Sequence, residues 1–358
     1  MKGGCIMTQL LDVRKMNILR AIVDDYILTA APVGSRTLSK RDDIELSPAT
    51  IRNEMSDLTE LGFLEQPHTS AGRVPSEKAY RLYVSNIMDR AQLTEDEAEY
   101  IKAHLSQRVS EVGDVIKETA RMLSGITKYT SVVQMPHMKN ARLKHISLVP
   151  VTEGSALAIV VTNSGATNST LLTVPKGITT AHLEKISSLM NTRLSGYKLV
   201  DVQTTLLPLL REEVGEQAES VAEMLEGISN DMTRQNVEVV GAANMLDYPE
   251  YSDVAKAKSF LSELEKGEVL KEVLSDDGDV EMTIRIGKEN DNPELKDCSV
   301  ITVSYRVCGE QVGSMGVIGP TRMDYGKVVA VLKFMSENLG KVLSRMLLGD
   351  GSDGANNK

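Results

Sequence analysis

The most constraining feature of this sequence is the stretch SPATIRNEMSDLTELGFLEQPHTSAGRVPS at residues 47–76, which joins a sharply bounded helix to a segment rich in Pro, Ser and Gly. Ser47 suits the N-cap of a helix, and Pro48 suits the first helical position, where its missing N–H costs nothing. Apolar residues then recur every three or four positions as far as Gly62, which predicts a helix with one buried stripe. Beyond Gly62, two short extended segments joined by PHTSAG predict a hairpin.

The face opposite the buried stripe is small, polar and able to form hydrogen bonds. At about 100° per residue, Thr50 and Arg52 flank the stripe and Asn53 points away from it. Arg can pair bidentately with guanine and Asn with adenine in the major groove of DNA. The residue types on the first turns of this helix therefore favour a helix that reads bases.

Two more predicted helices precede it, at residues 10–28 and 35–41, and Ser35 can cap the second of them. A short helix, a turn and a helix with exposed polar N-terminal turns form a helix-turn-helix pattern, and the hairpin adds a wing that reaches the DNA backbone or minor groove. The predicted DNA-binding residues are Ser35, Arg36, Ser47, Thr50, Arg52, Asn53, His68 and Arg73.

The charge balance of the chain argues against strong, nonspecific binding to DNA. The chain has a net charge of −10, and residues 1–90 hold 12 Lys+Arg against 12 Asp+Glu, so the N-terminal segment has no basic excess. Broad, nonspecific binding of nucleic acid is disfavoured, and DNA binding has to depend on geometry. The alternative is a ligand-sensing or chaperone-binding module whose winged helix contacts protein instead of DNA.

Two segments far apart in the chain resemble one known family. ATIRNEMSDLTELGFLEQPHTSAGRVPSEKAYRLYV at residues 49–84 and VIGPTRMDYGKVVAVL at residues 317–332 are similar to motifs of the heat-inducible transcription repressors, the HrcA family. The resemblance implies a homodimeric repressor of heat-shock chaperone operons of the GroE and DnaK type. It also implies binding to an inverted-repeat operator, the CIRCE element, and activity that depends on the GroE chaperonin.

The rest of the chain predicts an α+β multidomain protein. The resemblance implies an N-terminal winged helix-turn-helix domain and a GAF-like α/β sheet domain, interrupted by an inserted, mainly helical dimerisation domain. The predicted boundaries are 1–90 for the winged helix, 91–130 for linker helices, 131–199 and 263–348 for the two parts of the GAF-like domain, 200–262 for the insertion, and 349–358 for a disordered tail. The leader MKGGCIM precedes the first apolar periodicity, so Met1 and Met7 are both candidate start sites.

Catalytic, metal-binding and cofactor-binding patterns are weak, and an enzyme that uses the GAF-like pocket is a remote option. The five histidines lack HxxxH or HxH spacing, and the three cysteines match no zinc or CxxC pattern. GEQVGSMGVIG fails the dinucleotide fingerprint and predicts bulges or turns. The adjacent acids Asp24-Asp25 and Asp42-Asp43 are interpreted as solvated charges. We expect no cofactor, no membrane span and a cytoplasmic location.

Overall fold

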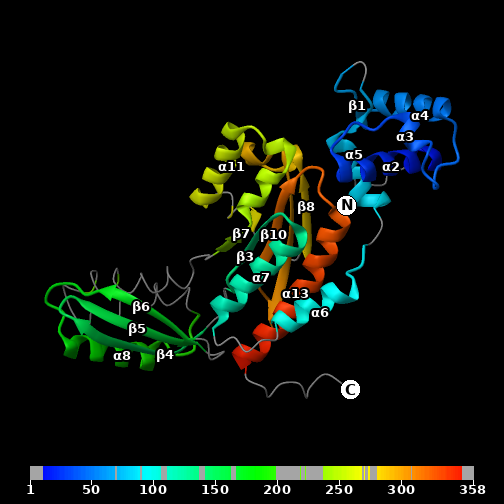
Figure 1. Ribbon diagram of the computed structural model, residues 1–358. Coiled ribbons are helices and arrows are strands. Elements are labelled where there is room, and N and C mark those ends of the chain that lie inside the picture. The colour runs from blue at the N-terminus through cyan, green and yellow to red at the C-terminus, as the bar shows by residue number, and fades with distance from the viewer. Residues whose placement is uncertain are drawn as a thin grey trace, which may run out of the picture. The chain divides into compact units, whose positions relative to one another are not determined.

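The structure is a computed structural model that describes most of the chain (Figure 1). The described residues are 11–68, 71–88, 91–105, 111–136, 142–162, 167–198, 218, 222, 237–267, 270, 273–274, 280–307 and 309–348. The fold mixes helices with antiparallel sheets, and the chain divides into two compact units. The first unit comprises 1–134, 237–305 and 314–339, and the second comprises 135–236, 306–313 and 340–358.

The first unit begins with a helical segment that we call the head (residues 11–88). Its first three helices are α2 (Val13–Thr29), α3 (Ser35–Leu38) and α4 (Pro48–Glu60). The predicted limits of α4 are confirmed, because Ser47 Oγ accepts a hydrogen bond from the backbone N–H of Thr50 at 3.1 Å and Gly62 adopts a φ of 76°. The predicted stripe is also buried, and it comprises Ile51, Met55 and Leu58.

The predicted wing follows α4. Strand β1 (Leu64–Glu65) pairs antiparallel with β2 (Val74–Pro75), and a bridge between Val33 and Arg73 ties the base of this hairpin to the segment before α3. Helix α5 (Glu77–Leu82) then begins at Ser76, whose side chain caps it, and continues into the π-helical turn η1 (Tyr83–Ile87). The wing is therefore anchored at its base by backbone pairing.

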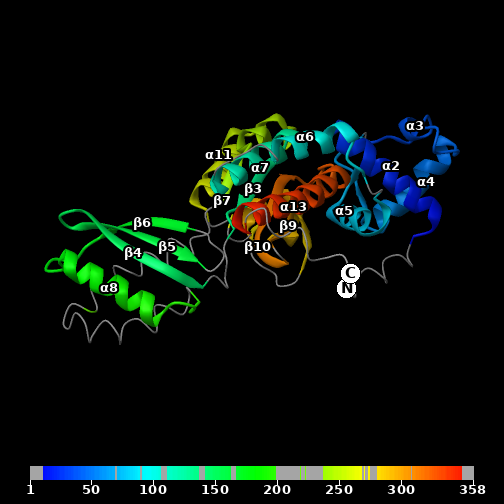
Figure 2. The same ribbon diagram turned by 90° about the horizontal axis from the view of Figure 1, so that it is seen from below.

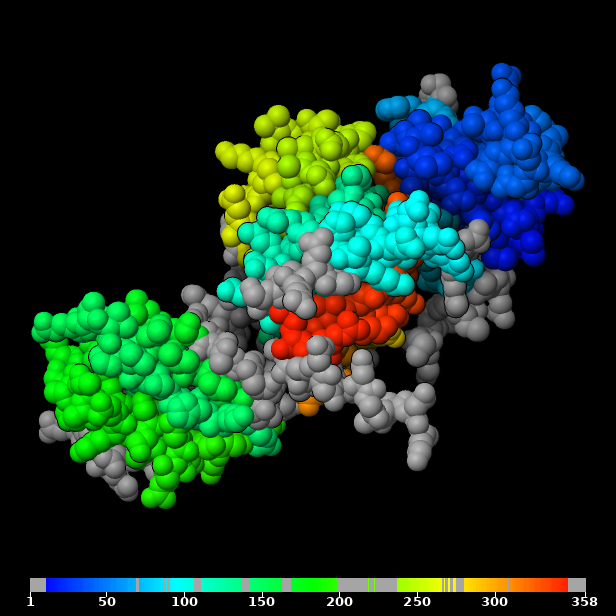
Figure 3. Space-filling view, turned by 60° about the horizontal axis from the view of Figure 1, so that its bottom comes forward, coloured from blue at the N-terminus to red at the C-terminus, as the bar shows by residue number. Residues whose placement is uncertain are grey.

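Two helices connect the head to the sheet of the first unit, as the sequence predicts. They are α6 (Glu95–Leu105) and α7 (Val112–Thr127). Thr94 and Glu97 exchange two hydrogen bonds of 3.2 Å at the start of α6, which is a capping box. Lys327 Nζ lies 3.0 Å from Glu97 Oε1, so α6 is tied to the C-terminal helix α13 (Tyr325–Leu348), and the cyan and red surfaces adjoin in Figure 3.

The rest of the first unit, which we call the body, is built on a five-stranded sheet of order β7-β3-β10-β9-β8. The strands in that order are Val237–Val240, Thr130–Gln134, Glu310–Pro320, Cys298–Val307 and Met282–Ile286. Neighbouring residues of β3 show that helices cover both faces, because alternate side chains of a strand point to opposite sides. Ser131 Oγ donates to Ala120 O of α7, whereas Val132 packs in a cluster with Phe260 of α11 (Val254–Lys266).

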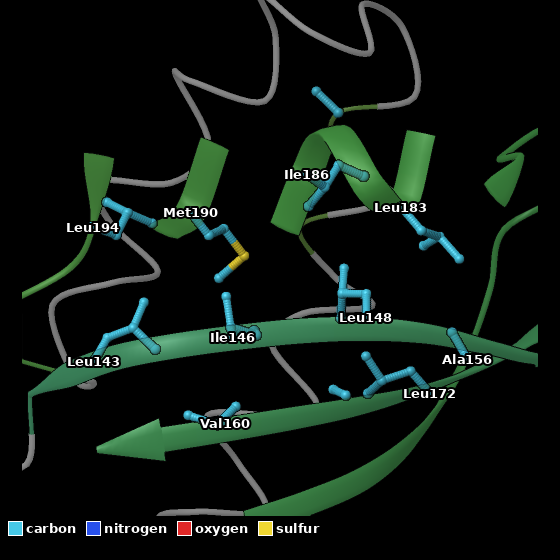
Figure 4. Packing of buried hydrophobic residues seen from close by; sticks show 12 residues of the cluster. Leu143, Ile146, Leu148, Ala156, Val160, Leu172, Leu183, Ile186, Met190 and Leu194 are labelled. Atoms are coloured by element: carbon cyan, nitrogen blue, oxygen red, sulfur yellow. The ribbon is translucent and has the colours of Figure 1, made fainter. Parts of the chain in front are cut away.

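The described part of the second unit between residues 142 and 198 is a three-stranded antiparallel sheet covered by one helix (Figure 2). Its elements are β4 (Leu143–Thr152), β5 (Ser155–Thr162), β6 (Thr167–Thr173) and α8 (Thr180–Arg193). In Figure 4, Leu183, Ile186 and Met190 point from α8 toward Ile146 and Leu148 of β4. Each fully buried aliphatic side chain contributes about 1.5–3 kcal/mol, so this layer closes a core of its own.

The predicted domain boundaries within 131–348 need correction. The segment 131–199 was expected to share a sheet with 263–348, but β4, β5 and β6 form a separate sheet, whereas β7 and α11 from the expected insertion 200–262 belong to the body. The reason is that β3 pairs with β10 along one edge and with β7 along the other, so β4 cannot pair with β3 and pairs with β5 instead. The described residues of 200–262 are mainly helical with the strand β7, as expected, but they pack on the sheet of the body.

Some predictions fall outside the described residues. These are the leader at 1–10, the tail at 349–358 and most of the expected helical segment at 200–236. Within the described residues, the helices are all too short or too polar to cross a membrane.

Candidate nucleic-acid interface

Helix α4 presents a polar N-terminal face to solvent. Arg52 and Asn53 are exposed, as are Ser47, Pro48 and Ala49, and Thr50 is half-buried beside them. The buried stripe fixes this orientation, since Ile51 is fully buried between Thr50 and Arg52. The face predicted to read bases is therefore accessible over the first two turns of the helix.

Ser47 and Thr50 are engaged in capping α4. Their hydroxyl oxygens lie 2.9 Å apart, in addition to the hydrogen bond from the Thr50 N–H to Ser47. The cap satisfies one of the amides that a helix N-terminus leaves without partners, and the helix dipole adds partial positive charge there. A phosphate group would be favoured at this end of the helix.

The two predicted contacts from α3 differ in position. Arg36 is exposed, but Ser35 is only 9% exposed and lies under the surface as the first residue of α3. Gly34, not Ser35, is the N-cap of α3, so the sequence misplaced this cap by one residue. Of this pair, only the Arg36 side chain is placed to reach a ligand.

Arg73 lies at the base of the wing and not at its tip. Its backbone exchanges hydrogen bonds of 2.8 and 2.9 Å with Val33, and its Nε donates to Thr59 Oγ1 of α4 at 3.0 Å. The half-buried side chain is thus partly committed to holding the wing against α4. His68 is exposed toward the tip of the hairpin, next to positions 69 and 70, which lie outside the described residues.

Sequence reasoning missed a cation that sits behind α4. Lys15 Nζ of α2 lies 2.7 Å from Glu54 Oε2 and 3.0 Å from Asp57 Oδ2, both on α4. Glu54 first and Asp57 second raise the pKa of Lys15 above its usual range. Carboxylates on a DNA-facing helix would repel phosphate, and the positive charge of Lys15 partly compensates the negative charges of Glu54 and Asp57. No local spacing signals this pair, because Lys15 and Glu54 lie on different helices.

Arg41 braces the turn between α3 and α4. Its Nε and Nη2 donate to Asp43 at 2.8 and 2.9 Å, and its Nη1 donates to Asp25 of α2 at 2.6 Å. The hydrogen bond from Arg41 lowers the pKa of Asp43 below its ordinary value. Asp24 is also engaged, because it accepts a hydrogen bond from the Tyr83 hydroxyl at 2.7 Å. The interpretation of these acids as solvated charges was therefore wrong for Asp24 and Asp25, which are partly buried, whereas Asp43 is paired but 60% exposed.

A metal site finds no support among the residues that the structure describes, where no group of three or more His, Cys, Asp or Glu side chains could hold an ion. What the head does offer is a helix-turn-helix with an exposed polar helix and a two-stranded wing. These features define the winged-helix class of regulators.

Comparisons with known proteins identify the family of the chain. The family model described as the HrcA protein C terminal domain matches residues 113–329. The heat-inducible transcription repressor HrcA of Pelotomaculum thermopropionicum is 42% identical over 345 residues, covering 95% of this chain and 99% of that protein. The protein of the same name from Brevibacillus brevis is 44% identical over 333 residues, covering 92% of this chain and 97% of that one. The chain belongs to the HrcA family.

A solved structure shows the same fold. The crystal structure of a hypothetical protein at 2.2 Å resolution superimposes with a TM-score of 0.64 and 22% sequence identity, covering 94% of this chain and 99% of that chain.

Proposed function

We propose that the protein is a dimeric repressor of heat-shock chaperone operons of the GroE and DnaK type, which binds an inverted-repeat CIRCE operator and depends on the GroE chaperonin for activity. The observation that carries this proposal is the exposed pair Arg52 and Asn53 on the first turns of α4. The names of the relatives, heat-inducible transcription repressors, support the regulatory part of it.

The chemistry of α4 suits a major groove. Arg52 has the donor fork for guanine O6 and N7, and Asn53 has the donor and acceptor for adenine N6 and N7. Arg36, His68 and Arg73 would contact the backbone on either side, with the N-terminus of α4 directed at a phosphate. In this arrangement, base contacts set specificity, and the flanking cations and amides set register.

An apolar row on the second unit supports the dimer. Strand pairing places Val149 opposite Leu157 and Leu157 opposite Leu171, so the three side chains share one face of the sheet. Val149 is 41% exposed and Leu171 is 65% exposed, whereas α8 covers the other face. A second copy of the chain would cover this row around a two-fold axis, and such an axis matches the symmetry of an inverted repeat.

The body suits a regulatory role. Its antiparallel sheet with helices on both faces fits the GAF-like domain that the family resemblance implies, and no cofactor enters the proposal. The balanced charge of the N-terminal ninety residues favours one competing function, in which the head contacts protein instead of DNA.

A gel-shift titration of the full chain tests the proposal. The probes are the CIRCE inverted repeat and a scrambled duplex of the same length, at two salt concentrations, with and without GroE chaperonin. We expect tight binding to the operator alone that weakens steeply with salt, because Lys and Arg release counterions from DNA. Equal, weak binding to both duplexes in the presence of chaperonin would reject DNA recognition and favour the protein-binding alternative.

Sedimentation of variants tests the dimer separately. Leu171→Glu places a charge in the apolar row and should shift the protein toward monomer. Val254→Glu is the matched control, since Val254 is 79% exposed on α11 of the body. An unchanged dimer in Leu171→Glu would exclude this face as the interface.

A further inference from the structure

The C-terminal motif at residues 317–332 has no part in the DNA-reading chemistry described above. It covers the end of β10 and the start of α13. Three of its residues contact distant elements: Arg322 contacts α2 of the head, Tyr325 contacts α5 of the head, and the backbone N–H of Asp324 donates to the Tyr129 hydroxyl. The motif is therefore one of the places where the body contacts the head.

Arg322 makes the most extensive of these contacts. Its Nε donates to Glu250 Oε1 at 2.6 Å and its Nη2 donates to Glu250 Oε2 at 3.3 Å, which is a bidentate pair. Its Nη1 donates to the backbone carbonyl of Ile27 at 3.1 Å, and its guanidinium lies 5.3 Å from the centre of the Tyr248 ring. The side chain is only 9% exposed. A planar fork held on three sides fixes orientation better than a flexible ammonium group could.

The hydrogen bond to Ile27 provides a partner for a carbonyl group at the C-terminal end of helix α2. The last carbonyl groups of a helix have no partners within the helix, and the helix dipole favours a cation beside them. Helix α2 has no basic residue in its own last turn. Arg322 supplies a cation from the body, so the contact between head and body adds to the stability of the end of α2.

A second arginine, Arg81 of the head, also joins the head to the body. Arg81 of α5 donates from Nε to Glu289 Oε1 at 2.7 Å and from Nη2 to the Ile284 carbonyl at 2.7 Å, and its Nη2 also contacts Glu289 Oε2. The ring of Tyr80 on α5 also contacts the ring of Tyr325 on α13, with centroids 6.0 Å apart. Two charged contacts on separate head helices resist rotation in a way that one contact could not.

We propose that Arg322 is a positioning residue for operator binding: by joining the Ile27 carbonyl to Glu250, it fixes the direction in which α4 faces relative to the body. This inference rests on the proposed function. A dimer selects a half-site spacing only when each head is held rigidly, because the two α4 helices must enter major grooves at a set separation. A freely rotating head would still bind a half-site but would accept many spacings.

The test uses three duplexes and the full chain. They are the inverted-repeat operator, the same repeat with its spacer lengthened by about half a helical turn (about five base pairs), and a single half-site. The variants are Arg322→Ala and Arg322→Lys, and the control is Arg121→Ala, since Arg121 is an exposed arginine on α7 that pairs only weakly with Glu118 at 3.6 Å.

The expected signature is a loss of spacing preference without loss of half-site binding. Arg322→Ala should reduce the preference for the native spacer by about tenfold, a size typical of coupling between sites. Half-site affinity should stay within about twofold, because Arg322 contacts Ile27, Glu250 and Tyr248, and the effects of substitutions at sites without shared contacts are additive. Arg322→Lys should fall between wild type and Arg322→Ala, and Arg121→Ala should match wild type.

Other outcomes overturn the inference. Wild-type spacing preference in Arg322→Ala would show that Arg322 does not position the head, and a parallel fall in half-site affinity would show a general structural role. If Arg322→Ala does not fold, Glu250→Gln, which keeps the side-chain volume and weakens the bidentate pair, is held to the same two criteria. Failure of the proposed function itself is distinguishable, because the wild-type protein would then not separate the operator from a scrambled duplex.

Discussion

Lys15 Nζ lies 2.7 Å from Glu54 Oε2, and this ion pair joins the first helix of the head to the helix that presents Arg52 and Asn53. Both side chains are largely buried, with exposed fractions of 18% and 12%. A pair shielded from solvent in this way is screened less than a surface pair and holds α4 in a defined position.

Replacing Lys15 should therefore destabilise the protein. We expect Lys15→Met to lower the free energy of unfolding by about 1–2 kcal/mol, because Glu54 loses the nearer of its two cations and keeps only Arg14, at 3.6 Å. Urea unfolding followed by circular dichroism measures the change. Lys40→Met is the control, since Lys40 is exposed in the turn after α3. Equal effects of the two substitutions would contradict a specific role for Lys15.

Arg52 should contribute to specificity more than to general affinity. Arg52→Ala is expected to weaken binding to the operator by about 1–3 kcal/mol and to leave binding to random duplex nearly unchanged. Ser56→Ala, one turn further along the exposed face of α4, serves as the matched control. A titration by fluorescence anisotropy on both duplexes gives the two affinities. An equal loss on both would rule out base reading by Arg52.

Arg73 should act on affinity through charge. Arg73→Ala is expected to weaken operator and random duplex alike, by about 1 kcal/mol, and to reduce the salt slope by about one. Thr59→Val removes the oxygen that accepts from Arg73 Nε but keeps the cation. If Thr59→Val weakened DNA binding as much as Arg73→Ala does, Arg73 would be a structural brace of the wing and not a phosphate contact.

Two glycines of the head should respond differently to alanine. A Cβ at Gly72 would collide with the backbone carbonyl of Val33, whereas a Cβ at Gly62 would meet nothing within 4 Å. Gly72→Ala should therefore lower the free energy of unfolding by about 3 kcal/mol, because the added Cβ forces the base of the wing away from Val33. Gly62→Ala should lower the free energy of unfolding by about 1 kcal/mol, because alanine is strained at the left-handed φ of this position. Thermal unfolding compares them, and an equal or reversed order would contradict the close packing at Gly72.

Cys298 should be inert while the protein is folded. It is fully buried against the Tyr251 hydroxyl, 2.8 Å from its Sγ, and burial raises the pKa of the thiol to about 12 from an ordinary 9.0. Because the thiolate is the reactive form, iodoacetamide at pH 8 should modify Cys298 only after unfolding in urea. A variant with Cys5→Ser and Cys308→Ser isolates the signal. Rapid modification of the native protein would contradict this burial.

The same shift predicts a dependence of stability on pH. The folded state keeps the Cys298 proton more tightly than the unfolded state does, so its contribution to stability is fully present below the unfolded pKa. That contribution is lost as the pH rises from about 9 toward 12. Cys298→Ser in the same background should flatten the fall over this range, as measured by urea unfolding at a series of pH values.

Much of the head could be predicted from the sequence because its signals are local. The cap at Ser47 and the left-handed Gly62 each depend on residues within a few positions of one another, as does the capping box of Thr94 and Glu97 beyond the head. The exposed position of Arg52 and Asn53 follows from helical periodicity in the same way. The error at Ser35 is also local, since the cap position is occupied by Gly34, which has no side chain to mark it.

By itself, then, the sequence determined the types and limits of most elements, the polar face of α4 and, through two motifs, membership in the HrcA family. Only the tertiary structure decided how the strands divide between two sheets, which cation lies behind α4, and that Arg322 contacts Ile27 across 295 positions of the chain. The physical reason is that caps and periodicity are fixed by neighbours in the chain. Strand partners and ion pairs depend instead on which edges and charges remain free once the whole chain has folded.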